Sequence, residues 1–472
     1  MTRNVVIFGG SFDPPHLMHR EIAQALVDQG YEVVAFPCGI RSDKDVRVDP
    51  AQRATYADLT FGKIPGVTVD LTDLEGTTFR RTVEVDAYFR EKFAGQEVEI
   101  FHAIGTDLIR GGATGASEIQ QAWYQGKELW NTLKFLIIER PEKPAPVEDD
   151  PPHSKRVHTC SRAISSTDIR NRIATGQPFE HLVPLCVAEQ IERYRSYRST
   201  VFKSVFSWEP SELKFLSVYD ARNPKAVTLM ERFAPLCDPD HATAILVIGG
   251  DGMMVDAVAD HWRRRLPFVG LNAGRRGFLL NDPESILAGG VLPTRFDIHH
   301  LPLLHAEIET ESGERQEVLA VNDVWMERMT SQSAMMEVLI DGELVIRPFF
   351  MGDSLICATP NGTTAYAGNA GGPCLDIGSP ELALVGVAPA RWLRWNYSVL
   401  PQDVVIEMKG LEIKKRPLRV CWDARQVDHV TRVCVRRSNS ASFQLAYFPG
   451  KNQRQKRMQF QFPDGSFTNT KS

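Results

Sequence analysis

Residues 4–37, NVVIFGGSFDPPHLMHREIAQALVDQGYEVVAFP, decide the fold of the N-terminal half. An apolar run ends in two glycines, a helical pattern follows, and a second apolar run closes the stretch. This succession is typical of a β-strand, an α-helix and a second, parallel β-strand. Apolar runs at residues 98–105 and 133–140 continue the alternation, so we expect a parallel sheet with helices on both faces.

The second half of the chain repeats this opening and then changes character. Residues 213–220, LKFLSVYD, and 242–252, ATAILVIGGDG, predict two strands of another α/β layer. After about residue 296, alternating segments with glycine turns predict a mostly β domain. The expected order is a Rossmann-like α/β domain over residues 1–198, a linker over 199–212, an α/β domain over 213–295, a β-rich domain over 296–449 and a basic tail over 450–472.

The composition is that of a globular protein with several domains. Of the 472 residues, 43% are hydrophobic and 24% are charged, which excludes a disordered chain. The net charge of -5 gives no general attraction to nucleic acid or to an anionic membrane, so we expect neither as a partner. The basic run KNQRQKR at residues 451–457 is interpreted as a solvated terminus.

Cysteine spacing and hydropathy indicate the compartment. The eight cysteines form no CxxC pair, which argues against a zinc knuckle or a secreted disulfide framework. The sequence has neither the pattern of a signal peptide nor an uninterrupted apolar run of about 18 residues. We therefore expect a cytoplasmic protein with reduced thiols.

The segment GGSFDPPHLMH at residues 9–19 contains a first set of phosphate-binding features. Gly9 and Gly10 end the first predicted strand and let phosphate approach the backbone, while the helix start that follows offers unpaired amides. His16 and His19 share one face of this helix, so both can donate hydrogen bonds to phosphate oxygens. The alternative interpretation of the histidine pair is two metal ligands.

A second segment, AISSTDIRNRI at residues 163–173, predicts another phosphate-binding helix start. Ser165, Ser166 and Thr167 offer hydroxyls and free amides, and Arg170 lies one turn further along on the same face. A planar guanidinium together with these donors suits β- and γ-phosphates. A simple helix cap is the alternative.

Together, GSFDPPHLMH and ISSTDIR resemble the signatures GxFxPxHxxH and ISSTxxR of the nicotinate or nicotinamide mononucleotide adenylyltransferases, over roughly residues 3–198. The resemblance implies that the mononucleotide phosphate attacks the α-phosphorus of ATP. Pyrophosphate then leaves with Mg²⁺ bound, without a covalent intermediate. The implied catalytic residues are His16, His19 and Arg170. The implied ATP-binding residues are Gly9, Gly10, Ser11, Phe12, Ser165, Ser166 and Thr167.

The same resemblance bears on the mononucleotide. The segment AIGTDLI makes Asp107 a candidate contact to the nucleoside, and Trp123 or Trp130 is the candidate platform for the pyridine ring. Lys44 and Arg53 match a basic pair of the family, with solvated charges as the alternative. The implied mononucleotide-binding residues are Lys44, Asp107 and Trp123.

The segment ILVIGGDGMMVDAV at residues 245–258 marks a second candidate site. Gly249, Gly250 and Gly252 lie on the turn between an apolar strand and a helix, where backbone amides can face phosphate. Asp251 projects from this turn. An aspartate in a glycine turn is alternatively a simple turn former.

Four segments follow GGDG in order: LNAGRRGFL at 271–279, LAVNDVW at 319–325, IDGELV at 340–345 and GDSLICATPNGTTAYAGNAGGP at 352–373. This ordered set resembles the NAD kinases over about residues 213–448. The resemblance implies that Asp251 activates the ribose 2′-hydroxyl and helps to hold Mg²⁺. The implied phosphate-donor residues are Gly249, Gly250, Gly252, Asn272 and Gly274. The implied NAD-binding residues are Asn322, Asp323, Thr359, Thr363, Ala365 and Tyr366.

Several positions depart from the NAD kinase pattern. Met253 stands where the family usually has threonine, and Arg276 replaces an apolar residue. Asp323 shortens the common glutamate, and WDARQ replaces an aspartate–glycine pair with Asp423 and Ala424. The segment VAPARWLRWN lacks the usual proline–histidine pattern. These departures keep open a regulatory role for the second half.

The sequence therefore predicts a bifunctional enzyme that makes NAD, or its deamido form, from ATP and a pyridine mononucleotide and then phosphorylates NAD to NADP. The expected partners are ATP, the mononucleotide, NAD and NADP, with Mg²⁺ as cofactor, and the resemblance implies a homo-oligomer. One alternative is an active adenylyltransferase with a non-catalytic NAD(P)-sensing domain. Another is adenylyl or cytidylyl transfer to a different phosphorylated alcohol. Nicotinate or nicotinamide, and ATP or polyphosphate, stay open.

Overall fold

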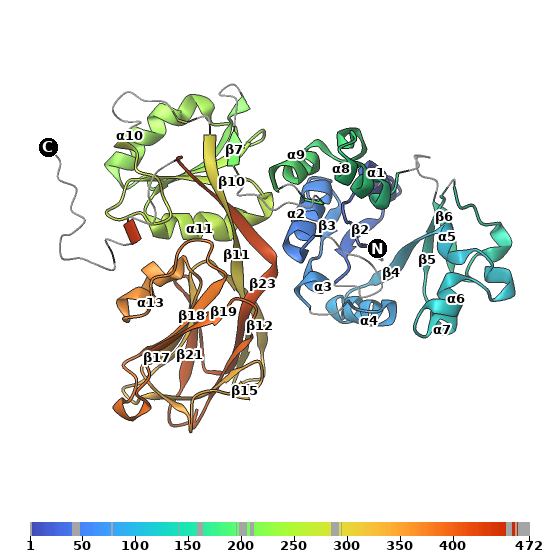
Figure 1. Cartoon of the computed structure of the whole chain (residues 1–472). Helices are drawn as coiled ribbons and strands as arrows, with labels where there is room; N and C mark the ends of the chain where they lie inside the picture. Colours follow the sequence, from blue (N-terminus) through green and yellow to red (C-terminus); the bar gives the residue numbers. More distant parts are fainter. Residues whose placement is uncertain are drawn as a thin grey trace. The chain divides into compact units, whose positions relative to one another are not determined.

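The chain divides into two compact units, residues 1–202 and 203–472 (Figure 1). Each unit has its own sheets and its own hydrophobic clusters. The computed structural model describes residues 2–39, 48–76, 79–140, 142–157, 164–194, 196–197, 205–207, 212–284, 292–293, 295–449, 456–457 and 460.

The first unit is built on a parallel sheet. Among its described residues, six strands pair in the order β3-β2-β1-β4-β5-β6, and every pairing is parallel. The chain leaves β1 in one direction through β2 and β3 and returns on its other side through β4. The carboxyl ends of β1 and β4 therefore flank a topological switch point, where open α/β sheets bind ligands. The strands are β1 (Arg3–Gly10), β2 (Glu32–Pro37), β3 (Val67–Val69), β4 (Val98–Gly105), β5 (Phe135–Ile138) and β6 (Ser154–Val157).

Helices cover both faces of this sheet. Side chains alternate along a strand, so neighbours on β1 point to opposite faces. Phe8 contacts the ring of Phe61 from α2, with 6.1 Å between the ring centroids. Ile7 instead belongs to a cluster with Phe89 of α4. The helices are α1 (Leu17–Asp28), α2 (Pro50–Phe61), α3 (Thr72–Glu75), α4 (Thr82–Lys92), α5 (Thr106–Ile109), α6 (Glu118–Ala122), α7 (Gly126–Thr132), α8 (Ser166–Thr175) and α9 (Leu185–Tyr194).

The second unit contains two sheets. Its described strands form an eleven-stranded mixed sheet and a six-stranded antiparallel sheet. The strands are β7 (Val205–Ser207), β8 (Phe215–Tyr219), β9 (Ala244–Gly249), β10 (Pro267–Asn272), β11 (Arg295–Thr310), β12 (Arg315–Ala320), β13 (Asp323–Arg328), β14 (Ala334–Ile340), β15 (Glu343–Leu344), β16 (Phe350–Gly352), β17 (Ser354–Ala358), β18 (Glu381–Val387), β19 (Tyr397–Pro401), β20 (Ile406–Gly410), β21 (Leu418–Trp422), β22 (Arg425–Asp428) and β23 (Val430–Tyr447). The helices are α10 (Pro224–Phe233), α11 (Asp251–His261) and α13 (Tyr366–Asn369).

The beginning of the second unit is a small parallel α/β layer. β8, β9 and β10 pair in parallel, as their unbroken apolar runs predict. Leu246 and Ile248 of β9 share a cluster with α10, whereas Ile245 and Val247 share a cluster with α11. The two helices therefore pack on opposite faces of β9.

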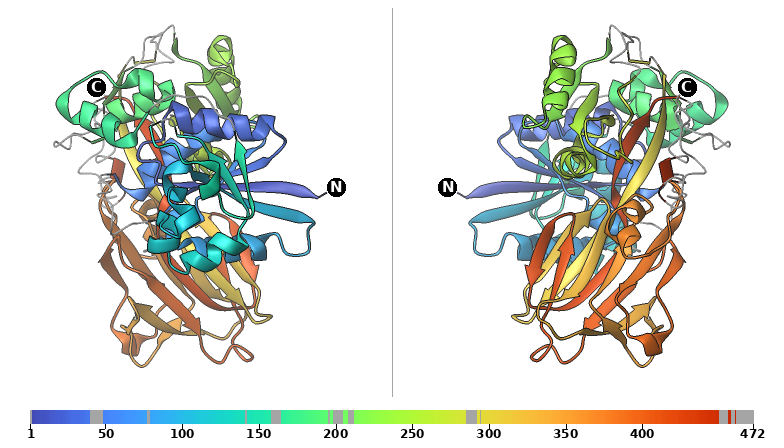
Figure 2. Two further views of the ribbon diagram at one scale, coloured as in Figure 1. Left: turned by 90° about the vertical axis from the view of Figure 1, so that its right-hand side faces the viewer. Right: turned by 90° about the vertical axis from the view of Figure 1, so that its left-hand side faces the viewer.

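Two long strands connect this layer to the β-rich part. β11 and β23 pair antiparallel along most of their length, as the yellow and red strands of Figures 1 and 2 show. β23 pairs with β20 near its start and with β10 near its end. The β-rich segment therefore returns to the α/β layer, and the two parts share one sheet. β7, inside the predicted linker, pairs with β11.

The interpretation of the basic run as a solvated terminus is wrong for two of its residues. Arg457 is only 3% exposed, and Lys456 donates hydrogen bonds to the body of the second unit. Burial of a charged side chain requires compensating partners, and backbone carbonyls accept hydrogen bonds from Lys456 Nζ and Arg457 Nη1.

The predicted α/β class with a parallel sheet is confirmed. Within the described part of the chain, no helix has the length and apolar character needed to cross a membrane.

Candidate active sites

The turn after β1 is held by an aromatic anchor. Phe12 is 2% exposed and has a φ of 44°. Its ring packs against Phe61 at 5.0 Å and His19 at 5.1 Å between centroids. The predicted ATP-binding residues Gly9, Gly10 and Ser11 therefore lie at the carboxyl end of β1, immediately before this anchor.

Arg53 supports the same turn from α2. Its Nε donates to the carbonyl of Ser11 at 2.9 Å, and its terminal nitrogens donate to the carbonyls of Cys38 and Gly39. The side chain is completely buried. The alternative of a solvated charge is therefore wrong, because the guanidinium ties the backbone of three loop residues together.

His16 and His19 form a stacked, neutral pair. Their ring centroids are 3.7 Å apart, and the backbone N–H of His16 donates to Nδ1 of His19 at 3.2 Å. Burial, followed by the positive charge of Arg140, lowers the pKa of His16 to about 3. Burial and the neighbouring His16 hold the pKa of His19 well below its ordinary range. Because Nδ1 of His19 accepts, its proton is assigned to Nε2, which is then a neutral donor.

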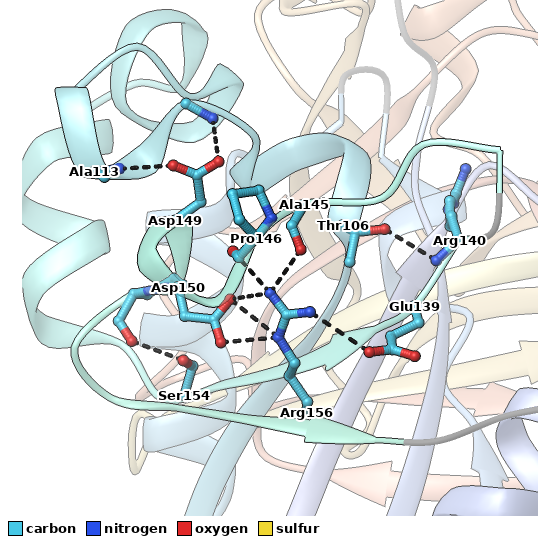
Figure 3. A network of polar contacts seen from close by, with 12 residues as sticks. Thr106, Ala113, Glu139, Arg140, Ala145, Pro146, Asp149, Asp150, Ser154 and Arg156 are labelled. Atoms are coloured by element: carbon cyan, nitrogen blue, oxygen red, sulfur yellow. Dashed lines mark hydrogen bonds and ion pairs between the residues drawn. The ribbon is translucent and has the colours of Figure 1, made fainter.

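Arg140 is a cation at this site that the sequence analysis missed. Its Nε lies 3.3 Å from a carboxylate oxygen of Asp107, and its backbone N–H donates to Thr106 at 2.9 Å (Figure 3). The predicted nucleoside contact Asp107 is therefore paired with an arginine. The available signal was the position of Arg140 shortly after the apolar run of β5, because parallel strands end at one edge.

The proline-rich loop after Arg140 is anchored at two acidic residues. Arg156 pairs with Asp150 at 2.7 Å and donates to the carbonyls of Ala145 and Pro146 (Figure 3). Asp149 accepts from the backbone N–H groups of Gly111 and Ala113. This network fixes the loop beside the segment that carries Asp107.

The start of α8 joins the two signature segments of the first unit. Ser165 caps the helix by accepting from the N–H of Thr167, and Ser166 Oγ donates to the carbonyl of Pro14 at 2.9 Å. Arg170 Nη1 donates to the carbonyl of Asp13 at 2.7 Å. Residues more than 150 positions apart in the chain are thus in direct contact.

The remaining mononucleotide predictions have different outcomes. Trp130 is a residue of α7 and is buried in a core cluster, and its role as a ring platform stays a prediction. Trp123 is half-buried and packs against the same cluster, and its role stays a prediction. Lys44 lies outside the described residues.

The glycine turn of the second unit presents Asp251 at the N-terminus of α11. The Asp251 carboxylate accepts hydrogen bonds from the backbone N–H groups of Phe278 and Leu279, at 3.0 and 2.8 Å. A negative charge is favoured at a helix N-terminus. The carboxylate is thus oriented by the loop that follows β10, and the helix N-terminus favours its negative charge.

Asn272 shapes that loop. Its side chain accepts from the N–H of Gly274 at 2.9 Å and donates to the carbonyl of Arg276. A Cβ on Gly274 would lie 3.4 Å from the Cα of Gly250, so the two glycine turns approach each other closely. A Cβ on Gly277 would come within 2.5 Å of the Asn272 side chain. The predicted phosphate-donor residues Gly250, Asn272 and Gly274 therefore lie together.

A second group of predicted residues meets at the start of β13. Thr359 donates its hydroxyl proton toward the carbonyls of Val321 and Asn322, both at 3.0 Å. Asp423 accepts from the backbone N–H groups of the same two residues. The loop that carries Asn322 is held on both sides, and the side-chain oxygen of Asn322 is buried without a hydrogen-bond partner.

Asp323 and Asp423 form a buried pair with unequal surroundings. Burial, reinforced by the negative charge of Asp423, raises the pKa of Asp323 to about 8. Burial also raises the pKa of Asp423, but the backbone N–H groups of Val321 and Asn322 oppose this rise and favour its ionised form, whereas Asp323 Oδ2 has no partner. Asp323 is therefore a protonated acid at neutral pH and can donate a hydrogen bond.

We expect Asp323→Asn to remove a pH-dependent loss of stability. Between pH 4 and 8, the native Asp323 keeps its proton while the unfolded one, with a pKa near 3.8, has lost it. Raising the pH therefore favours the unfolded state, by at most about 1.4 kcal/mol per pH unit for one group. Calorimetry at pH 5 and pH 8 should show that the melting temperature of the variant minus that of wild type is larger at pH 8 than at pH 5. An equal difference at both pH values, as expected for the exposed control Asp403→Asn, would contradict the assignment.

The TPNGTTAY segment completes this second cluster. Thr363 is fully buried, donates to the carbonyl of Pro360 and accepts from the N–H of Leu375. Tyr366 begins α13 directly after Ala365, and its ring contacts Trp325 at 5.2 Å between centroids. These residues shape the backbone around the turn, and their contact with NAD stays a prediction.

Comparison with known proteins shows the family to which the chain belongs. The chain is 36% identical to an NAD kinase of Brucella suis biovar 1 over 225 residues, which cover 46% of this chain and 84% of that protein. It is 34% identical to an NAD kinase of Xanthomonas oryzae pv. oryzae over 216 residues, covering 45% of this chain and 83% of that protein. The chain belongs to the NAD kinase family. No protein-family model matches it.

Solved NAD kinases resemble the chain more distantly. A yeast NADH kinase complexed with NADH aligns with a TM-score of 0.46 and 17% identity, covering 55% of this chain and 90% of that one. An Archaeoglobus fulgidus NAD kinase in complex with ATP aligns with a TM-score of 0.40 and 20% identity, covering 52% and 99%.

Met253, which departs from the NAD kinase pattern, lies on the core side of the glycine turn. Met253 packs against the cluster that contains Met254 and Val255 of α11. A Cβ on Gly249 would come within 2.9 Å of Met253. The substitution therefore replaces a hydroxyl by apolar packing behind the turn and leaves the Asp251 contacts intact.

Proposed function

We propose that the second unit transfers the γ-phosphoryl group of ATP to the 2′-hydroxyl of NAD. Membership of the NAD kinase family supports this activity. The observation that carries the mechanism is the Asp251 carboxylate, fixed by the amides of Phe278 and Leu279. A carboxylate held in this way can accept a proton without reorganising first.

In the proposed reaction, the ribose 2′-oxygen forms a bond to the γ-phosphorus while the bond between that phosphorus and the β–γ bridging oxygen breaks. ADP leaves, and the hydroxyl proton passes to Asp251. The glycine turns around Gly250 and Gly274 offer backbone amides to the phosphates. The protonated Asp323 can donate a hydrogen bond to NAD, and the unpaired amide oxygen of Asn322 can accept one from it.

The second site fits a magnesium ion that is held mainly by substrate phosphates. The described residues contain no group of three or more His, Cys, Asp or Glu side chains that could hold a metal by themselves. Asp251 would supply one oxygen ligand, since Mg²⁺ commonly combines one or two carboxylates with phosphates and water. Such an ion would neutralise negative charge on the transferred phosphoryl group.

We infer that the first unit is a Rossmann-like adenylyltransferase acting on a pyridine mononucleotide. The contact of Arg170 and Ser166 with residues 13 and 14 supports this, because it brings both signature segments to the carboxyl end of β1. The mononucleotide phosphate would attack the α-phosphorus of ATP, and the bond to the pyrophosphate oxygen would break. His16, His19 and Arg170 are the proposed donors to the leaving pyrophosphate.

The test is product analysis of the purified chain in two reactions. Mg·ATP with NAD should yield NADP and ADP. Mg·ATP with nicotinamide or nicotinate mononucleotide should yield the corresponding dinucleotide and pyrophosphate, and the faster of the two identifies the preferred base. Polyphosphate replaces ATP in a parallel kinase assay.

Each reaction is judged separately. NAD binding without NADP formation from any donor would leave the second unit as a nucleotide sensor. Absence of dinucleotide from both mononucleotides would reject the adenylyltransferase proposal, and trials with other phosphorylated alcohols would then follow.

A further inference from the structure

The basic segment near residue 456 contacts both halves of the proposed kinase site. Lys456, Arg457 and Phe460 are its described residues, and we call these three residues the basic latch. Of these three, Phe460 lies against Gly368 of α13. None of them entered the predicted site.

Lys456 is hydrogen-bonded to the loop that orients Asp251. Its ammonium donates to the carbonyls of Gly277 and Leu280, at 3.1 and 3.3 Å, and to the Asp282 carboxylate at 3.0 Å. Three acceptors match the three donors of an ammonium group. The loop carbonyls are thereby paired with a positive charge.

One peptide group connects Lys456 to Asp251. The carbonyl of Gly277 accepts from Lys456, and the N–H of the same peptide, on Phe278, donates to Asp251. A cation at the carbonyl end and a carboxylate at the N–H end polarise this peptide in the same direction. Rotation of the peptide would break both hydrogen bonds together.

Arg457 and Phe460 anchor the latch. Arg457 Nη1 donates to the carbonyl of Pro360, within the TPNGTTAY segment, and to the carbonyl of Leu375, further along the chain. The ring of Phe460 packs against Phe278 at 5.5 Å between centroids, and a Cβ on Gly368 of α13 would come within 2.9 Å of it. The latch therefore bridges the donor loop and the proposed NAD-binding turn.

We propose that Lys456 is a positioning residue for phosphoryl transfer, acting on Asp251 through the Gly277–Phe278 peptide. This inference rests on the proposed kinase function. Lys456 makes no contact with Asp251 itself, so its effect is to keep the carboxylate aligned with the hydroxyl that it deprotonates. Misalignment of a catalytic group lowers the rate of the chemical step more than substrate binding.

The experiment compares Lys456→Met with wild type in the full chain. Methionine keeps an unbranched apolar stem of similar length and removes the charge and the three donors. We expect the kcat of NADP formation to fall by about 10-fold with a KM for NAD within about threefold of wild type. Lys456→Arg, which keeps the charge, should recover most of the kcat. Adenylyl transfer by the same protein, and the exposed control Lys414→Met, should be unchanged.

Two further measurements separate positioning from loss of folded protein. The stoichiometry of NAD binding, measured by calorimetry, and the melting temperature of the kinase unit should match wild type. An unchanged kcat, a fall confined to NAD binding, or a fall that tracks the loss of folded protein would overturn the positioning role. A wild-type chain that makes no NADP from any donor would overturn the kinase function and the positioning role together.

Discussion

Asp251→Asn is expected to lower NADP formation by about 10³-fold, because removing a positioned general base typically costs between about 10² and 10⁴. Asparagine has nearly the same shape, so the glycine turn and α11 should fold as before. Its amide cannot take up the proton of the 2′-hydroxyl. Its NH₂ group would also face one of the N–H donors that now bind the carboxylate.

NADP is measured at saturating Mg·ATP and NAD, with adenylyl transfer followed in the same preparation. The matched control is Asp256→Asn, an exposed aspartate on the same helix. Full activity in the control, near-complete loss in Asp251→Asn and unchanged adenylyl transfer would support the proposed role. Undiminished NADP formation by Asp251→Asn would reject Asp251 as the base.

His19→Ala is expected to lower adenylyl transfer by about 10²- to 10³-fold, the range found when one preorganised donor to a developing anion is removed. The imidazole accepts the N–H of His16, which leaves its other nitrogen as the donor. Alanine removes this donor and the stacking partner of His16. The rate should vary little with protonation of either histidine above pH 5, because the pKa values of both are lowered.

Dinucleotide and pyrophosphate production provide the readout. His181→Ala serves as the control because His181 is exposed in the same unit. NADP formation from added NAD should be unaffected in both variants. A loss that appears only as weaker ATP binding, with unchanged kcat, would show that His19 binds the ground state and not the developing charge.

Some local features of the candidate sites could be predicted from the sequence because they depend on residues close together in the chain. Gly250, Asp251 and Gly252 lie where β9 leads into α11, and an apolar run that ends in glycines predicts a turn at this place. The helix cap at Ser165 is equally local, since its hydroxyl bonds to an amide two residues away. Such features depend on neighbours within one helical turn.

The contacts of other residues could not be predicted, because their partners are distant in the chain. Arg140 gains its significance from Asp107 and the histidine pair, which parallel strands bring to the same edge. Lys456 looked like a solvated charge, yet its acceptors lie more than 170 residues earlier. Trp130 is buried in a core cluster, and the sequence pattern of such a position does not differ from that of a ring platform.

The sequence alone determined the alternation of strands and helices, the glycine turns and the two families of motifs, because each is written in residue spacing or in short-range backbone chemistry. Only the tertiary structure decided that Asp323 is a protonated acid and that Arg53 holds the backbone of the loop at Ser11. It also decided that β11 and β23 join the α/β layer to the β-rich part. Burial, charge pairing and strand register depend on which distant segments meet, and no local pattern specifies that meeting.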